Sequence, residues 1–299
     1  MTLLLRGEPG FRWGQRPLVM GVLNLTPDSF SDGGRLCSVE AVLRQARRMR
    51  TAGADMLDLG AQSTRPGAAM VGTAEELRRL LPPLRALVAL RDTDPGLTLS
   101  IDTFDAAVAE AALAAGADWI NDVRGANVSP EVPGGSRRDA AMLPLIARCG
   151  CPYVLMHSRG TSQTMDAEAV YDDLLAEVRA ELLAATAMAL TAGVRREQLL
   201  WDPGLGFAKT TDQNLLLLRQ LGELAAEGYP LLVGPSRKRF IGEVLAQPRP
   251  RARLWGTAAV ASLAVAAGAA VLRVHDVAPI AQTMRMTAAV LRGRLTPDG

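Results

Sequence analysis

Polar side chains recur directly after short apolar runs of this sequence. Their positions are Asn24, Asp28, Asp58, Ser63 to Pro66, Asp102, Asn121, Asp122, His157, Arg159, Asp202, Ser236 to Lys238, Arg273, His275 and Asp276. Any one of them alone would more often be a loop cap or a solvated charge. Together they supply what a polar ligand carrying both hydrogen-bonding edges and a phosphate requires.

Three of these residues can recognise the edge of a flat heterocycle. Asp102 and Asp202 can accept hydrogen bonds from paired N–H groups, and Asn121 can both donate and accept. This combination is typical of a site for a ring such as a pterin.

A second group suits a phosphorylated end of the ligand. Arg65, Arg273 and His275 offer cationic or N–H donors for a diphosphate. Asn24 offers a neutral oxygen to Mg²⁺, which accepts such a ligand when phosphate oxygens and waters complete its octahedron. With only two histidines and no paired cysteine spacing, a zinc centre is not expected.

Two glycine-rich stretches and one lysine leave alternatives open. Residues 202–207 and 32–34 can be tight turns or phosphate-cradling loops. Lys238 can be a Schiff-base lysine, or it can belong with Arg237 and Arg239 to a solvated basic turn.

The elements that must position these side chains alternate along the chain. The apolar runs that predict strands are Leu18 to Val22, Met56 to Leu59, Leu97 to Ile101, Trp119 to Ile120, Tyr153 to Met156, Leu199 to Trp201, Leu231 to Val233 and Val271 to Val274. Segments with helical periodicity separate them, and a capping box of Thr73 and Glu76 predicts one helix start. The phrases around Gly53, Gly116 and Gly268 place a glycine where a helix would end.

Strict alternation without a linker favours an α/β protein built as a single (β/α)8 TIM barrel over an open doubly wound sheet. We expect one domain over residues 1–299, with the barrel core at about 17–293. In such barrels the active site lies at the carboxyl ends of the strands, where the polar residues fall.

Composition argues against several classes of protein. Thirty-three Lys and Arg residues against 31 Asp and Glu give a net charge of +2, so we expect no nucleic-acid partner. An odd count of three cysteines and a short apolar start predict a reduced, cytoplasmic protein. The charge-free stretch Leu254 to Leu272 is rich in alanine and interrupted by glycine, so we expect no membrane span.

Seven phrases of the sequence resemble the pterin-binding family, and within it the dihydropteroate synthases. They are Met20 to Gly34, Ser63 to Gly67, Ser100 to Thr103, Ile120 to Val123, Asp202 to Phe207, Gly234 to Lys238 and Arg273 to Asp276. They follow the family's order from the first strand to the last. The resemblance implies that 6-hydroxymethyl-7,8-dihydropterin diphosphate and p-aminobenzoate give 7,8-dihydropteroate and pyrophosphate, with Mg²⁺ as cofactor.

The resemblance also implies roles for particular residues. The pterin would be held by Asp102, Asn121, Asp202 and Lys238. The diphosphate would be held by Asn24, Thr64, Arg65, Arg273 and His275, with Asn24 also on the metal. The p-aminobenzoate, and sulfonamides that compete with it, would contact Phe30, Thr64, Pro66, Phe207 and Ser236. The residues implied to act in catalysis are Asp102, Lys238, Arg273 and His275.

Some positions depart from the family pattern. Gln62 stands where a glutamate is usual, Ala61 replaces a usual glycine, and the stretch 127–138 is longer than the norm. Family members are commonly homodimers, and we expect the same here.

Three other functions compete with this interpretation. A non-catalytic pterin-binding paralogue would keep the pterin residues and lose those for the diphosphate. A pterin-binding methyltransferase would share the barrel, but it would not need both the loop Thr26 to Phe30 and the turn Ser236 to Lys238. A Schiff-base aldolase acting through Lys238 would be trapped by borohydride with its carbonyl substrate.

Overall fold

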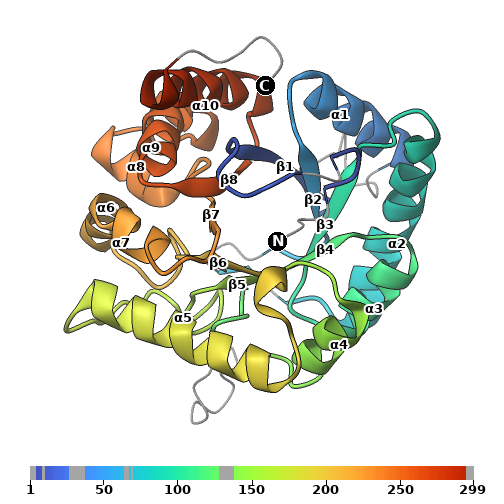
Figure 1. Cartoon of the computed structure of the whole chain (residues 1–299), viewed down its shortest axis with the longest axis horizontal. Coiled ribbons are helices and arrows are strands. Elements are labelled where there is room, and N and C mark those ends of the chain that lie inside the picture. The colour runs from blue at the N-terminus through green and yellow to red at the C-terminus, as the bar shows by residue number, and fades with distance from the viewer. Residues whose placement is uncertain are drawn as a thin grey trace.

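A closed barrel of eight parallel strands forms the centre of the molecule. The computed structural model describes residues 5–8, 11–26, 38–63, 67–68, 70–127 and 138–293. Neighbouring strands follow the chain order, and β1 pairs with β8 to close the ring. The strands are β1 (Leu18–Asn24), β2 (Met56–Gly60), β3 (Thr98–Asp102), β4 (Trp119–Asp122), β5 (Tyr153–Met156), β6 (Leu199–Asp202), β7 (Leu231–Val233) and β8 (Ala269–Val274). The predicted (β/α)8 barrel is confirmed (Figure 1).

Helices surround the barrel and cover its outer face (Figure 1). They are α1 (Val39–Thr51), α2 (Thr73–Ala89), α3 (Ala106–Ala114), α4 (Met142–Cys149), α5 (Leu174–Thr191), α6 (Thr211–Arg219), α7 (Leu221–Ala225), α8 (Arg239–Val244), α9 (Leu254–Ala266) and α10 (Val277–Arg292). Short 3-10 turns are η2 (Leu90–Asp92), η3 (Arg196–Gln198) and η4 (Pro250–Arg253).

Helix α1 has the sequence features that are typical of a helix start and of the turn after a helix. The side chain of Ser38 accepts a hydrogen bond from the Ala41 amide, and Val42, Ala46 and Met49 bury one face of the helix. Beyond its end, Gly53 adopts a φ of 100°, a left-handed conformation that glycine takes without steric cost.

The predicted capping box at the start of α2 is wrong. Gly72 is the N-cap residue, and no side chain caps this end of the helix. The Thr73 hydroxyl instead donates to the Asp105 carboxylate at the start of α3. Glu76 is only 2% exposed and pairs with Thr103 rather than with the helix end. Tertiary partners therefore displaced the local pairing.

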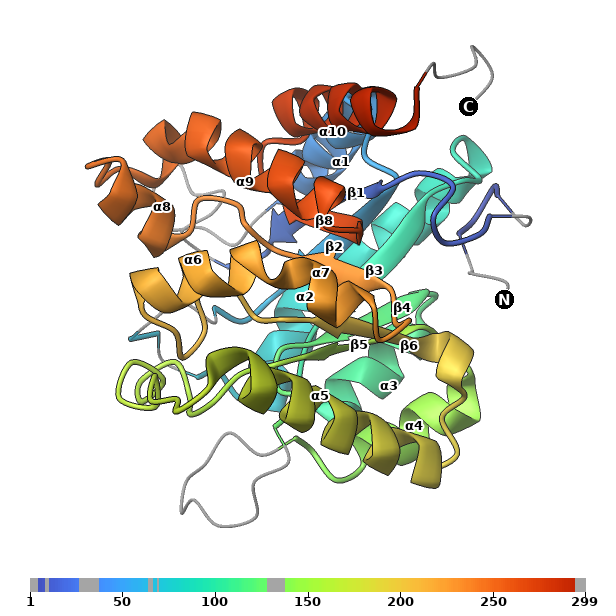
Figure 2. The ribbon, with the colours of Figure 1, turned by 60° about the vertical axis from the view of Figure 1, so that its left-hand side comes forward.

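The barrel interior changes from apolar to polar along the strand direction. Its amino end is filled by a cluster of inward-facing side chains that includes Met20, Met56, Trp119 and Val271. Phe11 joins this cluster, so the segment before β1 covers the amino end of the barrel (Figure 2). Polar residues occupy the carboxyl end of the barrel interior, where the loops that follow the strands begin.

The charge-free stretch 254–272 divides between α9 and β8. No helix within the described part of the chain combines the length and the apolar character needed to cross a membrane.

Candidate active site

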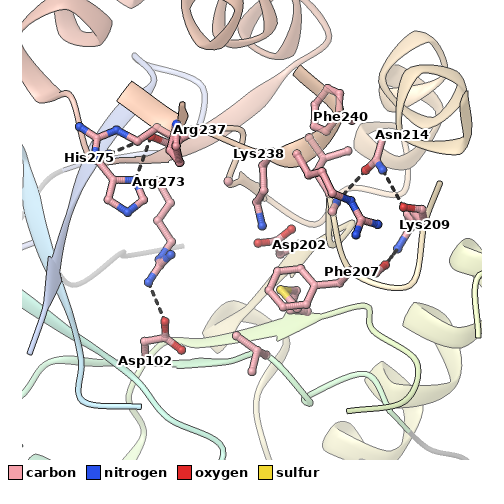
Figure 3. Close-up of a pocket in the computed structure, with 18 of the residues that line it drawn as sticks. Asp102, Asp202, Phe207, Lys209, Asn214, Arg237, Lys238, Phe240, Arg273 and His275 are labelled. Atoms are coloured by element: carbon pink, nitrogen blue, oxygen red, sulfur yellow. Dashed lines mark hydrogen bonds and ion pairs between the residues drawn. The ribbon is translucent and has the colours of Figure 1, made fainter. Parts of the chain in front are cut away.

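A cavity of about 480 Å³ lies at the carboxyl ends of the strands. It is lined by every residue assigned above to a substrate, the metal or catalysis that the structure describes, namely Asn24, Asp102, Asn121, Asp202, Phe207, Ser236, Lys238, Arg273 and His275. Figure 3 labels six of them, Asp102, Asp202, Phe207, Lys238, Arg273 and His275. The other four predicted residues, Phe30, Thr64, Arg65 and Pro66, lie outside the described residues. Residues far apart in the sequence meet here because the strand ends converge on one rim.

Arg273 and Asp102 line the floor of the cavity, and the buried carboxylate of Asp58 lies behind them. Nε of Arg273 donates to Oδ2 of Asp58 at 2.6 Å, and its Nη2 donates to Oδ2 of Asp102 at 2.6 Å. Asn121 adds a hydrogen bond of 3.3 Å from Nδ2 to the same Asp58 oxygen. Figure 3 shows Arg273 reaching across the cavity to Asp102.

Burial shifts the acid–base properties of this floor. Removal from water raises the pKa of Asp102 to about 7, although the Arg273 guanidinium opposes the shift. Burial lowers the pKa of Arg273, but the Asp58 and Asp102 carboxylates outweigh it and raise that pKa above its usual range. Arg273 is therefore a permanent cation, and Asp102 changes charge near neutral pH.

Asp202 and Lys238 face the cavity from β6 and from the turn after β7. Oδ1 of Asp202 accepts from the Gly204 amide at 2.7 Å, which fixes the carboxylate at the start of its loop. Lys238 extends toward Asp202 and places Nζ 4.2 Å from the centroid of the Phe207 ring (Figure 3). Burial raises the pKa of Asp202 to about 6 and lowers the pKa of Lys238 to about 8, with the Asp202 charge opposing the latter shift.

His275 and Asn24 meet at the seam between β8 and β1. The Ser236 hydroxyl contacts His275 twice, accepting from its amide at 3.1 Å and lying 3.0 Å from Nδ1. Nε2 of His275 lies 3.5 Å from Nδ2 of Asn24. Because the Asn24 nitrogen faces the imidazole, its side-chain oxygen is the atom left for a cation.

The donor set near Asn24 limits which metal could bind. Over the ranges that the structure describes, no group of three or more His, Cys, Asp and Glu side chains could hold an ion. A metal caged by protein ligands alone does not fit these residues. One neutral amide oxygen fits Mg²⁺, which keeps waters and phosphate oxygens as its other ligands.

The basic residues that flank Lys238 have other partners. Arg237 forms a bidentate pair with Asp276, with Nε–Oδ2 and Nη2–Oδ1 distances of 2.9 Å and 2.6 Å. Arg239 pairs with Asp166 on the surface. All three residues line the cavity, but Arg237 and Arg239 are paired with carboxylates, whereas Lys238 extends toward Asp202, so the solvated basic turn considered from the sequence does not describe it.

Lys209 was not predicted from the sequence, yet it lines the cavity with only 4% of its surface exposed. Its Nζ contacts Nδ1 of His157 at 2.9 Å, the Gly204 carbonyl at 3.2 Å and the Phe207 carbonyl at 3.1 Å. An ammonium has three donors, and all three are used. Lys209 therefore secures the loop that follows Asp202 and carries Phe207.

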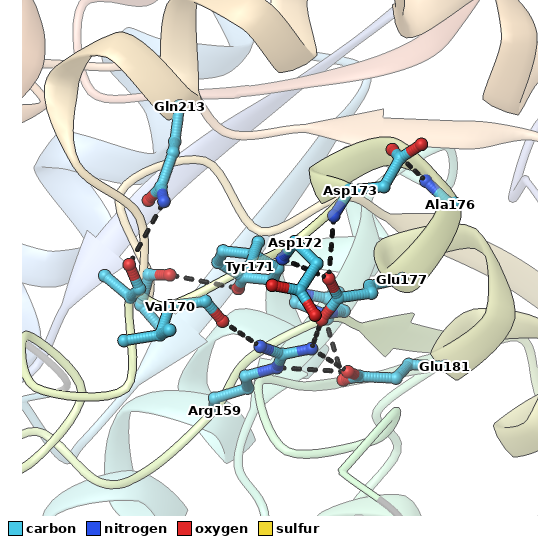
Figure 4. Close-up of polar contacts among 12 residues, drawn as sticks. Arg159, Val170, Tyr171, Asp172, Asp173, Ala176, Glu177, Glu181 and Gln213 are labelled. Atoms are coloured by element: carbon cyan, nitrogen blue, oxygen red, sulfur yellow. Dashed lines mark hydrogen bonds and ion pairs between the residues drawn. The ribbon is translucent and has the colours of Figure 1, made fainter.

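His157 and Arg159, which the sequence grouped with the rim residues, do not line this cavity. His157 is fully buried, and its Nε2 lies 3.0 Å from Glu181. Burial lowers its pKa to about 4, and the Lys209 charge adds to the shift. Arg159 turns outward to Glu177 and Glu181 and lies 4.0 Å from the centroid of the Tyr171 ring (Figure 4). Both residues support the loop after β5.

Asp122 is likewise structural. Its carboxylate accepts from the Tyr153 hydroxyl at 2.6 Å and from the Arg124 amide at 2.8 Å, and it is fully buried. Of the two adjacent polar residues that end β4, only Asn121 faces the cavity.

The loop after β2 contains two of the three departures from the family pattern, Ala61 and Gln62. Gln62 lines the cavity, whereas Ala61 is buried and its carbonyl accepts from Arg79 at 3.3 Å. After the part that is not described, Gly67 donates to the Ser162 carbonyl at 2.7 Å, and the Ser162 hydroxyl donates to the Ala68 carbonyl at 2.8 Å. These bonds attach the end of this loop to the loop after β5.

The sequence profile of a family described as pterin binding enzymes matches residues 20–275, which is most of the chain. The chain belongs to the pterin-binding enzyme family. A dihydropteroate synthase from Synechocystis is 48% identical over 286 residues, covering 96% of this chain and 94% of that one.

Solved structures of this family show the same barrel. Xanthomonas albilineans dihydropteroate synthase with 4-aminobenzoic acid has a TM-score of 0.83 at 42% identity, and covers 94% of this chain and 95% of that one. The same enzyme in complex with 7,8-dihydropteroate has a TM-score of 0.79 at 40% identity, with the same coverage of both chains. The family resemblance that the motifs indicated is confirmed, and the similarity extends along nearly the whole length of this chain.

Proposed function

We propose that the protein is a dihydropteroate synthase, a transferase that joins the methylene carbon of 6-hydroxymethyl-7,8-dihydropterin diphosphate to the amine of p-aminobenzoate. The C–O bond to the diphosphate breaks, pyrophosphate leaves with the electron pair, and the amine forms the new C–N bond and loses a proton. The observation that carries this proposal is the meeting of the predicted pterin and diphosphate residues in one cavity of a pterin-binding barrel.

We assign the heterocycle to the part of the cavity around Asp102, Asn121, Asp202 and Lys238. Two carboxylates and an amide can match the N–H groups and ring nitrogens of a pterin, and the Lys238 ammonium can donate to its carbonyl oxygen. All four side chains come from strand ends or from the turn after β7, so the ring site rests on rigid elements.

We assign the diphosphate to the adjoining part of the cavity, where Arg273, His275 and Asn24 lie. Arg273 and His275 can donate to phosphate oxygens and stabilise charge that grows on the leaving group. Mg²⁺, when bound through the Asn24 oxygen, would supply further charge neutralisation at the diphosphate. Thr64 and Arg65, expected here from the sequence, remain part of this proposal.

We propose that the leaving group departs before the amine attacks. A cation then forms on the pterin methylene, and the Asp102 carboxylate on the cavity floor is placed to stabilise it when ionised. We assign Phe207 and Ser236, which line the cavity, to the p-aminobenzoate site. Phe30, Thr64 and Pro66, which lie outside the described residues, remain part of this assignment.

We further propose that the enzyme is a cytoplasmic homodimer. Cys149 and Cys151 are free thiols, which suits a reducing compartment. Large apolar side chains are exposed on α9 and α10, among them Trp255 at 78%, Leu263 at 62% and Val290 at 69%. Since α9 and α10 pack on each other, these side chains offer a surface that a second copy can cover.

The proposal is tested by product formation. The purified protein is incubated with dihydropterin diphosphate, p-aminobenzoate and Mg²⁺, and dihydropteroate is measured by mass spectrometry. We expect product with the wild type and with Asp166→Asn, which alters an exposed carboxylate outside the cavity lining, and a loss on the order of 100-fold with Asp102→Asn. Tight pterin binding without product would indicate the non-catalytic paralogue.

A further inference from the structure

Asp58 has no role in the chemistry described so far, although it lies directly behind the cavity floor and contacts two residues that line it. It is on β2, it is 0% exposed, and its Oδ2 accepts from both Arg273 and Asn121. Arg273 was assigned above to the diphosphate part of the cavity, and Asn121 was assigned to the pterin part. Asp58 therefore joins the two parts of the proposed active site.

The two hydrogen bonds to Oδ2 compensate the negative charge of Asp58. Its second oxygen, Oδ1, is buried and has no hydrogen-bond partner among the residues that the structure describes. An ionised carboxylate in such a place requires a close cation. Arg273 supplies it through Nε at 2.6 Å.

The two carboxylates hold Arg273 in different ways. Asp58 is inaccessible and binds Nε, the atom nearest the backbone end of the guanidinium, whereas the Asp102 side chain is 10% exposed and binds the terminal Nη2. A guanidinium has five N–H donors in one plane, so an anion can take the terminal donors without disturbing Nε.

We propose that Asp58 is a positioning residue that fixes Nε of Arg273 while the terminal nitrogens transfer from Asp102 to the diphosphate. This inference rests on the proposed function. Without the substrate, Arg273 neutralises Asp102. When the diphosphate takes the terminal nitrogens, the Asp102 carboxylate loses its partner and its charge becomes available to the pterin cation. The anchor at Asp58 keeps the guanidinium in the site throughout this exchange.

The experiment compares Asp58→Asn with wild type in three measurements. They are the affinity for pyrophosphate with Mg²⁺, the affinity for 6-hydroxymethylpterin, which lacks the diphosphate, and kcat. We expect pyrophosphate affinity and kcat to fall about 10- to 100-fold, because a displaced guanidinium no longer fits the anion. Affinity for 6-hydroxymethylpterin should change less than about threefold, since the amide oxygen that remains at position 58 can still accept from Asn121, whereas Arg273 loses a charged partner. Equal losses for both ligands, or no loss of pyrophosphate affinity, would overturn the proposal.

Two further variants separate positioning from general damage. Ser100→Ala alters a buried side chain paired in register with Asp58, and should leave all three measurements within about twofold of wild type. Arg273→Lys keeps the cation but removes the fork that reaches both carboxylates. In that background Asp58→Asn should cause no additional loss of pyrophosphate affinity, whereas a purely structural role would give the same loss in both backgrounds.

The binding measurements do not depend on turnover. If wild type bound pyrophosphate and the pterin but made no product, the proposed function would fail while the role of Asp58 in holding Arg273 would still be tested.

Discussion

Gly204 lies against the backbone of His157 so closely that a Cβ atom on Gly204 would be 1.8 Å from the His157 carbonyl oxygen. The contact joins the loop after β6, which follows Asp202 and carries Phe207, to the residue that follows β5. No side chain fits in this space, and Gly204 also has a φ of 70°.

Gly204→Ala is therefore expected to destabilise the protein by about 3 kcal/mol or more, because the clash with backbone adds to the strain of a left-handed alanine. Thermal unfolding measures the loss. Gly14→Ala is the matched control, since Gly14 has a φ of 87° but no atom within 4 Å of its added Cβ. It should cost only the backbone strain of about 1 kcal/mol. Similar losses for both variants would show that the contact with His157 is not tight.

Activity should have a bell-shaped pH dependence. Asp102 must be ionised to stabilise the cation, and burial raises its pKa to about 7, so kcat/KM should fall as the pH drops below that value. Lys238 must be protonated to donate to the pterin, and burial lowers its pKa to about 8, so kcat/KM should also fall above pH 8. The measurement is kcat/KM for the dihydropterin diphosphate between pH 5 and 10.

Lys238→Arg provides the control for the alkaline limb. Arginine stays charged throughout this range, so the fall above pH 8 should disappear even if the maximum rate is lower. A fall that persists unchanged would assign it to another group.

His157 should make the fold sensitive to acid. Burial lowers its pKa from 6.5 to about 4, so between these values the unfolded chain binds a proton that the folded protein does not. Stability is thus fully present above pH 6.5 and falls as the pH drops toward 4. The loss is about 3 kcal/mol, since each pH unit corresponds to about 1.4 kcal/mol. Urea unfolding at pH 7 and at pH 4.5 should show a smaller difference for His157→Gln than for wild type, and equal differences would contradict this role.

Trp255→Glu is expected to convert the proposed dimer into a monomer, because a charge at the centre of an apolar interface must be desolvated. Light scattering after gel filtration gives the mass. Val170→Glu is the control, because Val170 is 73% exposed on the loop after β5, away from α9 and α10. A wild-type protein that is monomeric at micromolar concentration would refute the dimer.

Much of the fold was predictable because strands, helices and glycine-ended turns are specified locally. The residues that end the strands were predictable for the same reason, since a parallel barrel brings all strand ends to one rim. Asp58 was expected to follow the second strand, but it lies in the middle of β2, and its partner could not be deduced. That partner is Arg273 on β8, and β1 separates β8 from β2 in the barrel. The contact therefore depends on the direction in which the Arg273 side chain extends.

Lys209 was missed for a physical reason. A lysine after a glycine-rich loop is usually solvated, and only the convergence of His157 with two loop carbonyls makes its burial possible. The capping box predicted at Thr73 was wrong for a different reason. The local sequence pattern is present, but Thr73 pairs with Asp105 and Glu76 pairs with Thr103.

Pyrophosphate release tests the central claim most directly. The wild-type protein is given dihydropterin diphosphate and Mg²⁺, with and without p-aminobenzoate, and a sulfonamide is added to a third sample. A synthase releases pyrophosphate in step with the added p-aminobenzoate, and the sulfonamide raises the p-aminobenzoate concentration needed. Failure to release pyrophosphate with both substrates present, while the pterin still binds, would contradict the account.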